Sequence, residues 1–194
     1  MFEPQSIGML LVLLGVGLSC SGSLYRMPVI GQWDIQVSSF LHLKLNRYLA
    51  LFRLLWPLGK SLLTVVLLIL LFFSDWTSGG WALGFYVLIS CIERALKLTL
   101  KRQRPFSLLA DVGMYQPRSP HDPSHPSGDV LRVWYLTVVL PVAFALSWPL
   151  VLLFVCIALL VSLGRIAFGV HFLLDIVGGA GLGLFGAGLY CLSL

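Results

Sequence analysis

A short proline-rich segment, HDPSHPSGDV at positions 121–130, concentrates histidine, aspartate and serine in an otherwise apolar chain. Its Pro-Ser-Gly precedes an apolar run, so we expect Ser127 and Gly128 at the start of a helix. A helix start binds anions through its dipole and its unpaired N–H groups. Ser127 could instead only cap the helix. The segment therefore predicts an anion site, a helix cap, or both, because the two uses share the same donors.

A basic cluster, KLTLKRQRP, precedes this segment. Lys97 and Arg104 are seven residues apart, so on one helix they would lie two turns apart on the same face. Pro105 is expected to end that helix. Two cations at a helix end suit an oxyanion, and arginine can bind phosphate through two parallel hydrogen bonds. The alternative is that these side chains only snorkel at a membrane boundary.

A third group of polar residues lies in GRIAFGVHFLLD, at positions 164–175. His171 and Asp175 are four apart and would share one helix face, with Arg165 six residues before the histidine. A carboxylate so placed can hold the Nδ1 proton of the imidazole and leave Nε2 free to attack. Such a pair is also common as a structural contact, but ionisable groups at a membrane boundary favour a function.

The composition places these residues in a membrane protein. Of 194 residues, 58% are hydrophobic and 11% are charged, and the mean hydropathy is +0.94. Soluble domains have about 25% charged residues, so an ordinary soluble fold is excluded. The sequence predicts an all-α polytopic bundle, forming a single domain over residues 1–194. With roughly 20 residues per span, the six predicted spans are Ile7–Leu24, Leu54–Phe73, Gly80–Leu100, Val130–Trp148, Pro149–Gly169 and Phe172–Leu194.

The predicted spans gather the polar segments on one side of the membrane. Residues 25–53, 101–129 and 165–171 would all lie there, and the connections on the opposite side are short. Within residues 25–53, apolar positions recur at helical spacing beside Lys44 and Arg47, so a surface-lying amphipathic helix is predicted. This layout is typical of a membrane enzyme rather than a channel.

The three motifs together resemble the type-2 phosphatidic acid phosphatase family, whose catalytic core is shared with vanadium haloperoxidases. The motifs are Lys-six residues-Arg-Pro, then Pro-Ser-Gly, then Arg-five residues-His-three residues-Asp, over residues 97–175. The resemblance implies a lipid phosphatase that needs no metal or other cofactor. It implies that His171 is the nucleophile, forming a phosphohistidine, and that Asp175 orients it. The phosphate-binding groups it implies are Lys97, Arg104, Ser127, the Gly128 amide and Arg165.

Two positions depart from the family pattern. Gly164 stands where the family has serine, and Asp129 stands where it has the histidine that protonates the leaving group. Asp129 could be the acid if burial raises its pKa. His121 or His125 could replace the missing histidine. Alternatively, the substrate needs little acid, which favours a polyprenyl diphosphate such as undecaprenyl diphosphate, because its leaving group is a phosphate monoester with a second pKa of about 6.

The proline-rich segment also permits a metal site. The spacing in HDPSH is that of helical zinc ligands, but Pro123 and Pro126 argue against a helix there. The candidate ligands would be His121, Asp122, His125 and Asp129.

The expected function is hydrolysis of a lipid phosphate or diphosphate in a bilayer, with no nucleic-acid partner. The alternatives are a lipid phosphotransferase, a phosphatase for phosphatidylglycerophosphate or phosphatidate, and a non-catalytic lipid-phosphate-binding protein. We expect a multi-pass protein of the inner (plasma) membrane. The 13 Lys and Arg residues avoid the short loops and both termini, which points to a cytoplasmic site. The resemblance favours an extracytoplasmic site instead, and we adopt that orientation.

Overall fold

The structure is a computed structural model that describes residues 4–194, and every regular element in that range is helical. The longer helices are α1 (Pro4–Gly22), α2 (Pro28–Leu45), α4 (Ser61–Ser74), α5 (Trp76–Leu100), α7 (Gly128–Ala143), α8 (Trp148–Ala167) and α9 (Leu173–Leu192). Shorter pieces are η1 (Ser23–Arg26), η2 (Asn46–Tyr48), α3 (Leu49–Leu55), η3 (Trp56–Gly59) and α6 (Pro105–Leu108).

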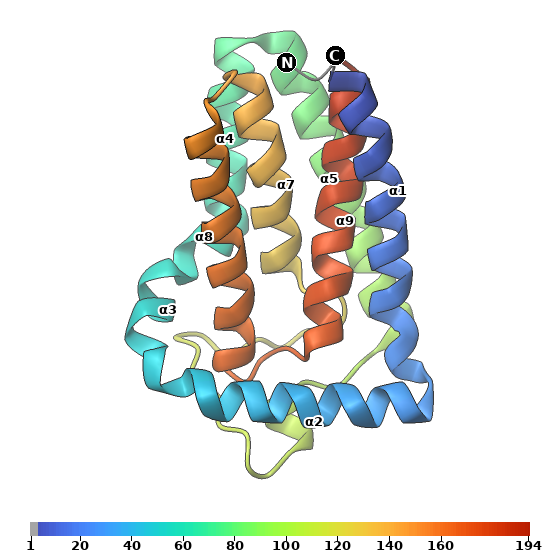
Figure 1. Cartoon of the computed structure of the whole chain (residues 1–194), viewed down its shortest axis with the longest axis vertical. Coiled ribbons are helices and arrows are strands. Elements are labelled where there is room, and N and C mark those ends of the chain that lie inside the picture. Colours follow the sequence, from blue (N-terminus) through green and yellow to red (C-terminus); the bar gives the residue numbers. More distant parts are fainter. Residues whose placement is uncertain (1–3) are drawn as a thin grey trace.

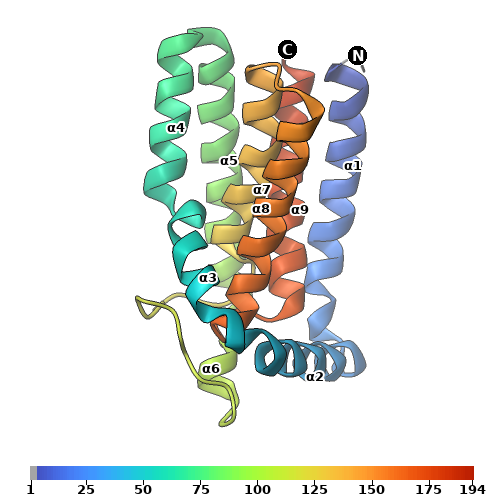
Figure 2. The same cartoon turned by 60° about the vertical axis from the view of Figure 1, so that its left-hand side comes forward.

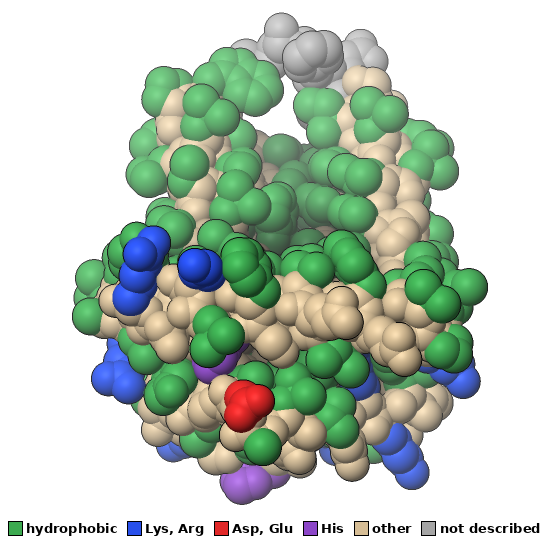
Figure 3. Space-filling model, turned by 60° about the horizontal axis from the view of Figure 1, so that its bottom comes forward, with side chains coloured by type: hydrophobic (Ala, Val, Ile, Leu, Met, Phe, Trp, Pro, Cys, Tyr) green, Lys and Arg blue, Asp and Glu red, His purple; other side chains and the backbone are tan. Residues whose placement is uncertain are grey.

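The long helices form a bundle with one elaborated end. Helices α1, α4, α5, α7, α8 and α9 run side by side, and α2 lies across their lower end in the view of Figure 1. The segment that contains α6 lies at the same end (Figure 2), while the connections from α4 to α5 and from α7 to α8 lie at the other. The predicted gathering of the polar segments at one end is therefore observed. In the space-filling view that brings this end forward, Lys and Arg side chains lie at several places around it, among hydrophobic side chains and uncharged polar or backbone atoms (Figure 3).

Fewer helices can span a membrane alone than the sequence predicted. Among the described residues, three are long and apolar enough: Gln5–Arg26, Trp148–Ala167 and Leu173–Leu192. A pair bent by 47°, Pro28–Gly59 with Ser61–Ser74, raises this to four if it forms one broken span. Helix α7 has only 16 residues, below the roughly 20 of a full span. The chain is a membrane protein, and the six-span layout stays a prediction.

Glycines bring α9 into close contact with α7. A Cβ at Gly179 would lie 2.4 Å from the backbone oxygen of Ser127, and one at Gly183 would lie 2.4 Å from that of Leu131. No larger residue fits either position without moving α7, as expected where helix backbones approach closely. This contact fixes the start of α7 against α9, and Ser127 N donates to Asp175 O over 3.0 Å.

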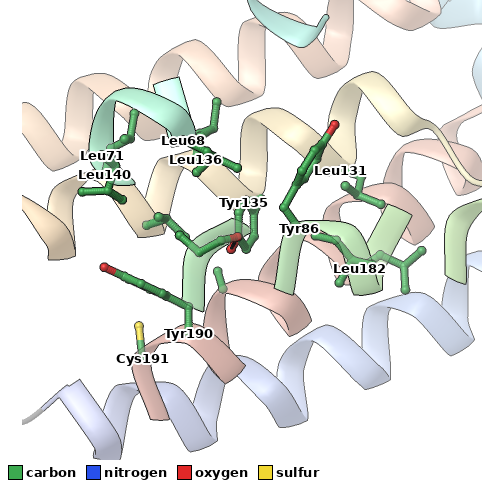
Figure 4. Packing of buried hydrophobic residues seen from close by; sticks show 14 residues of the cluster. Leu68, Leu71, Tyr86, Leu131, Tyr135, Leu136, Leu140, Leu182, Tyr190 and Cys191 are labelled. Atoms are coloured by element: carbon green, nitrogen blue, oxygen red, sulfur yellow. Dashed lines mark hydrogen bonds between the residues drawn. The ribbon is translucent and has the colours of Figure 1, made fainter. Parts of the chain in front are cut away.

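The apolar core fills the bundle away from the elaborated end. Figure 4 shows side chains from α4, α5, α7 and α9 packed together, with Tyr135 among them. The Tyr135 hydroxyl donates to the Ala82 carbonyl over 2.6 Å, which satisfies a polar atom that would be costly to bury unpaired. This packing holds the helices whose ends carry the polar residues.

Helix α2 is amphipathic, but its polar face is buried against the bundle and its apolar face points outward. Its buried residues are all polar, namely Asp34, Ser38 and His42, four residues apart. Its outer face carries apolar side chains such as Val29 and Leu43, which are 80% and 62% exposed. The helical periodicity was predicted, but the buried stripe is polar because α2 covers the charged end of the bundle. An apolar outer face of this kind is suited to lying in a membrane interface.

Candidate active site

A cavity of about 170 Å³ opens where α5 ends and α7 begins. It brings together residues from four segments that are far apart in the sequence. Its lining includes five of the predicted site residues, Lys97, Arg104, Gly128, Asp129 and His171. The other lining residues are Lys60, Glu93, Gln116, Pro120, Asp122 and Arg132.

One part of the lining, which we call the nucleophile cluster, consists of Glu93, Lys97, Arg104, Asp122 and His171. The Lys97 ammonium contacts Asp122 and lies 3.0 Å from Glu93 Oε1. Arg104 Nη2 donates to Asp122 Oδ1 over 2.9 Å. Burial alone would raise the pKa of Asp122, but its hydrogen bond to Lys97 and the charges of Lys97 and Arg104 lower that pKa to about 2. The Asp122 carboxylate is thus ionised and occupies the donors that an oxyanion would need.

Lys97 and Arg104 do not share a helix, contrary to the sequence prediction. Helix α5 ends at Leu100, and Lys101 has a left-handed conformation with φ 46°. Arg104 precedes Pro105 and is extended, with ψ 152°, as expected for a residue before proline. The helix thus ends between the two cations, and both still reach Asp122.

His171 lies in the turn between α8 and α9, with its side chain buried. Its Nε2 is 3.3 Å from Arg104 Nη1, and its Nδ1 is 3.6 Å from Asp175 Oδ2. The second distance is longer than a hydrogen bond, so the predicted pairing is present as a close approach. Burial, followed by the charge of Arg104, lowers the pKa of His171 to about 4. The imidazole is therefore neutral near pH 7, as a nucleophile must be.

Asp175, at the first turn of α9, is shared by two histidines. Besides His171, it approaches His125, whose Nδ1 lies 3.3 Å from Asp175 Oδ1. The Nε2 of His125 faces the Ser23 hydroxyl at 3.4 Å. His125 is buried and does not line the cavity, and His121 is exposed and does not line it either. Neither histidine is therefore placed to replace the missing acid.

Further polar groups fix the Asp175 carboxylate. It accepts hydrogen bonds from the Ser124 hydroxyl, from Phe172 N over 2.9 Å and from Arg102 Nη1 over 2.7 Å. Arg102 also contacts Asp34 of α2, and its guanidinium lies 4.2 Å from the centre of the Phe172 ring.

Helix α2 also caps the start of α9. Leu173 N donates to Ser38 Oγ over 2.8 Å, and Leu174 N donates to Asp34 Oδ1 over 3.0 Å. These bonds satisfy N–H groups that the first turn of a helix leaves unpaired. The transverse helix thus holds the segment that carries His171 and Asp175.

A second group, which we call the Asp129 cluster, consists of the lining residues Lys60, Asp129 and Arg132 together with Arg165, which contacts Asp129. Asp129 Oδ2 lies 2.8 Å from Lys60 Nζ and 2.8 Å from Arg165 Nη1, and its Oδ1 lies 3.2 Å from Arg132 Nη1. Three neighbouring cations favour the ionised carboxylate. These contacts favour Asp129 as an ionised counterion and do not support its predicted role as the proton donor, which stays a prediction.

Arg165 lies behind Asp129 and is not part of the cavity lining. Its Nη1 also donates to Gln116 over 3.2 Å and its Nη2 to the Trp56 carbonyl over 3.1 Å. A Cβ on the preceding Gly164 would lie 3.1 Å from Phe52 Cδ1. The serine found there in the family would crowd that ring, which accounts for this departure in packing terms.

Ser127 is the N-cap residue of α7 by position, but its side chain makes no capping bond. Its buried Oγ has no hydrogen-bond partner among residues 4–194. The predicted cap is thus absent, and the hydroxyl is left unpaired beside Gly128. A Cβ on Gly128 would lie 2.3 Å from Glu93 Oε1, so glycine is needed for Glu93 to approach the helix start.

The four candidate metal ligands of the proline-rich segment are not brought together. Asp122 binds Lys97 and Arg104, His125 faces Asp175, and Asp129 binds three cations. Residues 4–194 contain no group of three or more His, Cys, Asp or Glu side chains that could hold a metal ion. The metal interpretation is therefore not supported by the arrangement of these residues.

The family model of the PAP2 superfamily matches residues 79–193, which is more than half of the chain. The chain belongs to the PAP2 superfamily. Membership makes it an enzyme, a membrane lipid phosphatase that hydrolyses phosphoric esters. The predicted resemblance is thereby confirmed.

Two solved structures of PAP2 proteins have the same fold. One is the PAP2-type phosphatidylglycerolphosphate phosphatase from Bacillus subtilis, with a TM-score of 0.68 and 23% identity, covering 98% of this chain and 94% of that chain. The other is LpxE from Aquifex aeolicus, with a TM-score of 0.66 and 27% identity, covering 82% of this chain and 94% of that chain. No curated protein sequence matches this PAP2 chain.

Sequence reasoning missed two cations of the PAP2 site, Lys60 and Arg132, both of which line the cavity. Arg132 follows Asp129 by three residues at the start of an expected helix, a spacing that indicates a same-face pair. Lys60 follows WPLG at the edge of an apolar run and carried no comparable signal.

Proposed function

We propose that the chain hydrolyses a lipid diphosphate, of the polyprenyl diphosphate class to which undecaprenyl diphosphate belongs, through a phosphohistidine at His171. The observation that carries the proposal is the approach of Arg104 Nη1 to His171 Nε2 at 3.3 Å, in a cavity that Lys97 also lines. A phosphoryl group bound by the two cations would present its phosphorus to the neutral imidazole. Phosphoryl transfer depends mainly on such positioning and charge neutralisation.

The first step forms a bond from His171 Nε2 to the terminal phosphorus. The bond to the bridging oxygen breaks, and its electron pair leaves with the lipid phosphate. The phosphorylated ring is then cationic, and the Asp175 carboxylate 3.6 Å from Nδ1 stabilises it. Water next attacks the phosphorus, the N–P bond breaks, and dihydrogen phosphate leaves with both water protons. Neutral His171 is regenerated, and the covalent step divides one difficult displacement into two easier ones.

Binding would use the residues around His171. Lys97 and Arg104 hold the terminal phosphoryl oxygens, and the unpaired Ser127 hydroxyl and the Gly128 amide add donors from the start of α7. Arg165 acts from behind Asp129, since it contacts that carboxylate at 2.8 Å. No step requires a metal, because these side chains supply the positive charge.

The preference for a diphosphate follows from the acid position. Asp129 is held by three cations, and the cavity lining in residues 4–194 includes His171 as its single histidine. An alcohol leaves poorly without a proton donor. A phosphate monoester, with a second pKa of about 6, leaves readily without one.

A substrate panel tests the proposal. Purified protein in detergent, with a chelator present, would be offered a polyprenyl diphosphate, phosphatidate and phosphatidylglycerophosphate, with His171→Ala as the control. We expect fastest phosphate release from the diphosphate and a base-stable, acid-labile phosphoprotein in rapidly quenched samples. Faster hydrolysis of phosphatidate would contradict the diphosphate assignment. Phosphate appearing on an added acceptor lipid would instead indicate transfer.

We further propose a single domain that crosses the plasma membrane six times, with the cavity outside the cytoplasm. Figures 1 and 2 support the six crossings, because α1, α4, α5, α7, α8 and α9 run alongside one another. The family resemblance supports the extracytoplasmic orientation. A cysteine at exposed Arg118 would test the orientation. Labelling by an impermeant thiol reagent in intact cells is expected, and labelling only after lysis would reverse the orientation.

A further inference from the structure

We propose that Lys60 and Arg132 form a subsite for the second phosphate of the substrate, the phosphate that leaves attached to the lipid. This inference rests on the proposed function and names the residues that would select a diphosphate over a monophosphate. Neither residue lies in the three sequence motifs, and both line the same cavity as His171.

The two residues come from separate elements and meet at one carboxylate. Lys60 lies in the break between η3 and α4, and Arg132 lies one turn into α7. Asp129 holds both, at 2.8 Å from Lys60 Nζ and 3.2 Å from Arg132 Nη1. This fixes two flexible cations at the cavity wall before any ligand binds.

The charge balance of the Asp129 cluster favours a further anion. Three cations surround a single carboxylate. Arg165 is 1% exposed at its side chain and engaged by Gln116 and Trp56, so it serves the structure. The side chains of Lys60 and Arg132 are 30% and 18% exposed, and both face the cavity. Lys60 and Arg132 therefore place the surplus positive charge of this cluster at the cavity, where a ligand would bind.

Both side chains also have unused hydrogen-bond donors. An ammonium has three N–H donors and a guanidinium has five. Within residues 4–194, Lys60 uses one donor on Asp129. Arg132 directs Nη1 to Asp129 and to the Gly59 carbonyl, and its guanidinium also interacts with the Tyr86 hydroxyl, so only part of its five donors remains for a ligand. A monophosphate bound by Lys97 and Arg104 would make no hydrogen bonds with the remaining donors of Lys60 and Arg132. A diphosphate would engage them with its second phosphate through charge-assisted bonds.

The subsite would act on the bond that breaks. His171 attacks the terminal phosphorus, and the electron pair of the P–O bond moves onto the bridging oxygen of the lipid phosphate. Lys60 and Arg132 then neutralise the charge that grows on this leaving group. The role that the family histidine fills with a proton would here be filled by fixed positive charge.

Calorimetric titration of the full chain in detergent tests the subsite directly, with methylenediphosphonate and inorganic phosphate as the two probes. Lys60→Met and Arg132→Met should each weaken methylenediphosphonate about ten-fold or more, the loss expected for a hydrogen bond to a charged group. The same variants should weaken inorganic phosphate several-fold less. Lys44→Met and Arg53→Met are matched controls, because both residues are exposed and away from the cavity.

Equal weakening of the two probes, or no weakening of either, would overturn the subsite. Lys60→Arg should restore tight diphosphonate binding, which separates loss of charge from misfolding of a Met variant. Binding does not depend on turnover, so the two proposals can fail independently. Selective diphosphonate binding without phosphate release would overturn the proposed function alone, and hydrolysis with unselective binding would overturn the subsite alone.

Discussion

The two charged clusters that share the cavity are balanced in opposite ways. In the nucleophile cluster, two cations, Lys97 and Arg104, face two carboxylates, Glu93 and Asp122. In the Asp129 cluster, three cations face one carboxylate. The cations beside His171 are therefore neutralised until a ligand displaces a carboxylate, whereas the other cluster keeps a permanent surplus.

Asp122 and Asp129, the aspartates at the centres of the two clusters, also differ in exposure and in how firmly they are held. The Asp122 side chain is 37% exposed and lies in the segment between α6 and α7, so it can move aside. The Asp129 side chain is 16% exposed and is fixed in the first turn of α7. The Asp122 carboxylate would compete with the substrate for Lys97 and Arg104, whereas the Asp129 carboxylate holds Lys60 and Arg132 in place at the cavity wall. Each prediction below changes one cluster and leaves the other intact.

The largest effect is expected at the nucleophile. His171→Ala removes the atom that forms the phosphohistidine, so kcat should fall by about 10³-fold or more, as when other covalent catalysts lose their nucleophile. His121→Ala is the control, because that side chain is exposed and away from the cavity. Phosphate release under saturating substrate provides the measurement. A loss below about ten-fold would place the chemistry on another residue.

Asp129→Asn should have the second largest effect, on stability. It leaves Lys60, Arg132 and Arg165 without their shared counterion, and removing one partner from a buried ion pair costs about 3–5 kcal/mol. Because Lys60 is partly exposed, we expect about 2–4 kcal/mol, read as a lower unfolding temperature in detergent. Asp122→Asn is the matched comparison and should shift that temperature much less. An unchanged melting temperature for Asp129→Asn would show that Asp129 is not a structural counterion.

The sequence predicts the family and the end of the bundle that carries the site better than it predicts the local geometry. The motif order predicted roles for Lys97, Arg104 and His171 from their residue types, and the structure brings the three residues to one cavity. The same reasoning placed Lys97 and Arg104 on one helix, since spacing does not reveal that Lys101 turns left-handed. It also extended one span to Trp148, although α7 ends at Ala143 and Ala145 has φ 47°.

The partners of each charge could not be predicted because tertiary packing selects them. Asp122 and Asp129 are seven residues apart in one polar segment, and nothing in their spacing indicates which cations they meet. The close approach of Gly59 to Asp129, where an added Cβ would lie 2.9 Å from Asp129 Cβ, places the carboxylate beside Lys60, which is 69 residues away. For this reason the sequence alone could not decide between the metal and acid interpretations of this segment.

A smaller effect is expected on the pH dependence of the nucleophile cluster. Because the pKa of His171 is lowered to about 4, the ring stays neutral as pH falls from 6.5 to 5. Hydrolysis should decline only as pH approaches 4. A histidine with an ordinary pKa of about 6.5 would already lose roughly ten-fold at pH 5.5. The kcat profile in detergent gives the measurement.

Arg104→Gln sharpens this test. Removing the cation 3.3 Å from Nε2 removes one cause of the low pKa. The acid limb of the residual activity should therefore move upward, toward 6.5. Arg53→Met, on an exposed site, should leave the limb where it is. A limb near 6.5 in the unaltered chain would show that the imidazole is better solvated than its buried position indicates.

The smallest effect is expected when the competing carboxylate is removed. Asp122→Asn frees the donors of Lys97 and Arg104 that now bind Asp122 Oδ1 and Oδ2. Inorganic phosphate should then inhibit hydrolysis about three- to ten-fold more tightly, the gain expected from one hydrogen bond to a charged group at a partly exposed site. Asp111→Asn, exposed in the same segment, should not change the inhibition constant. Weaker inhibition would mean that Asp122 holds the two cations in place for the substrate. The nucleophile cluster would then resemble the Asp129 cluster, with its carboxylate acting as a fixed support.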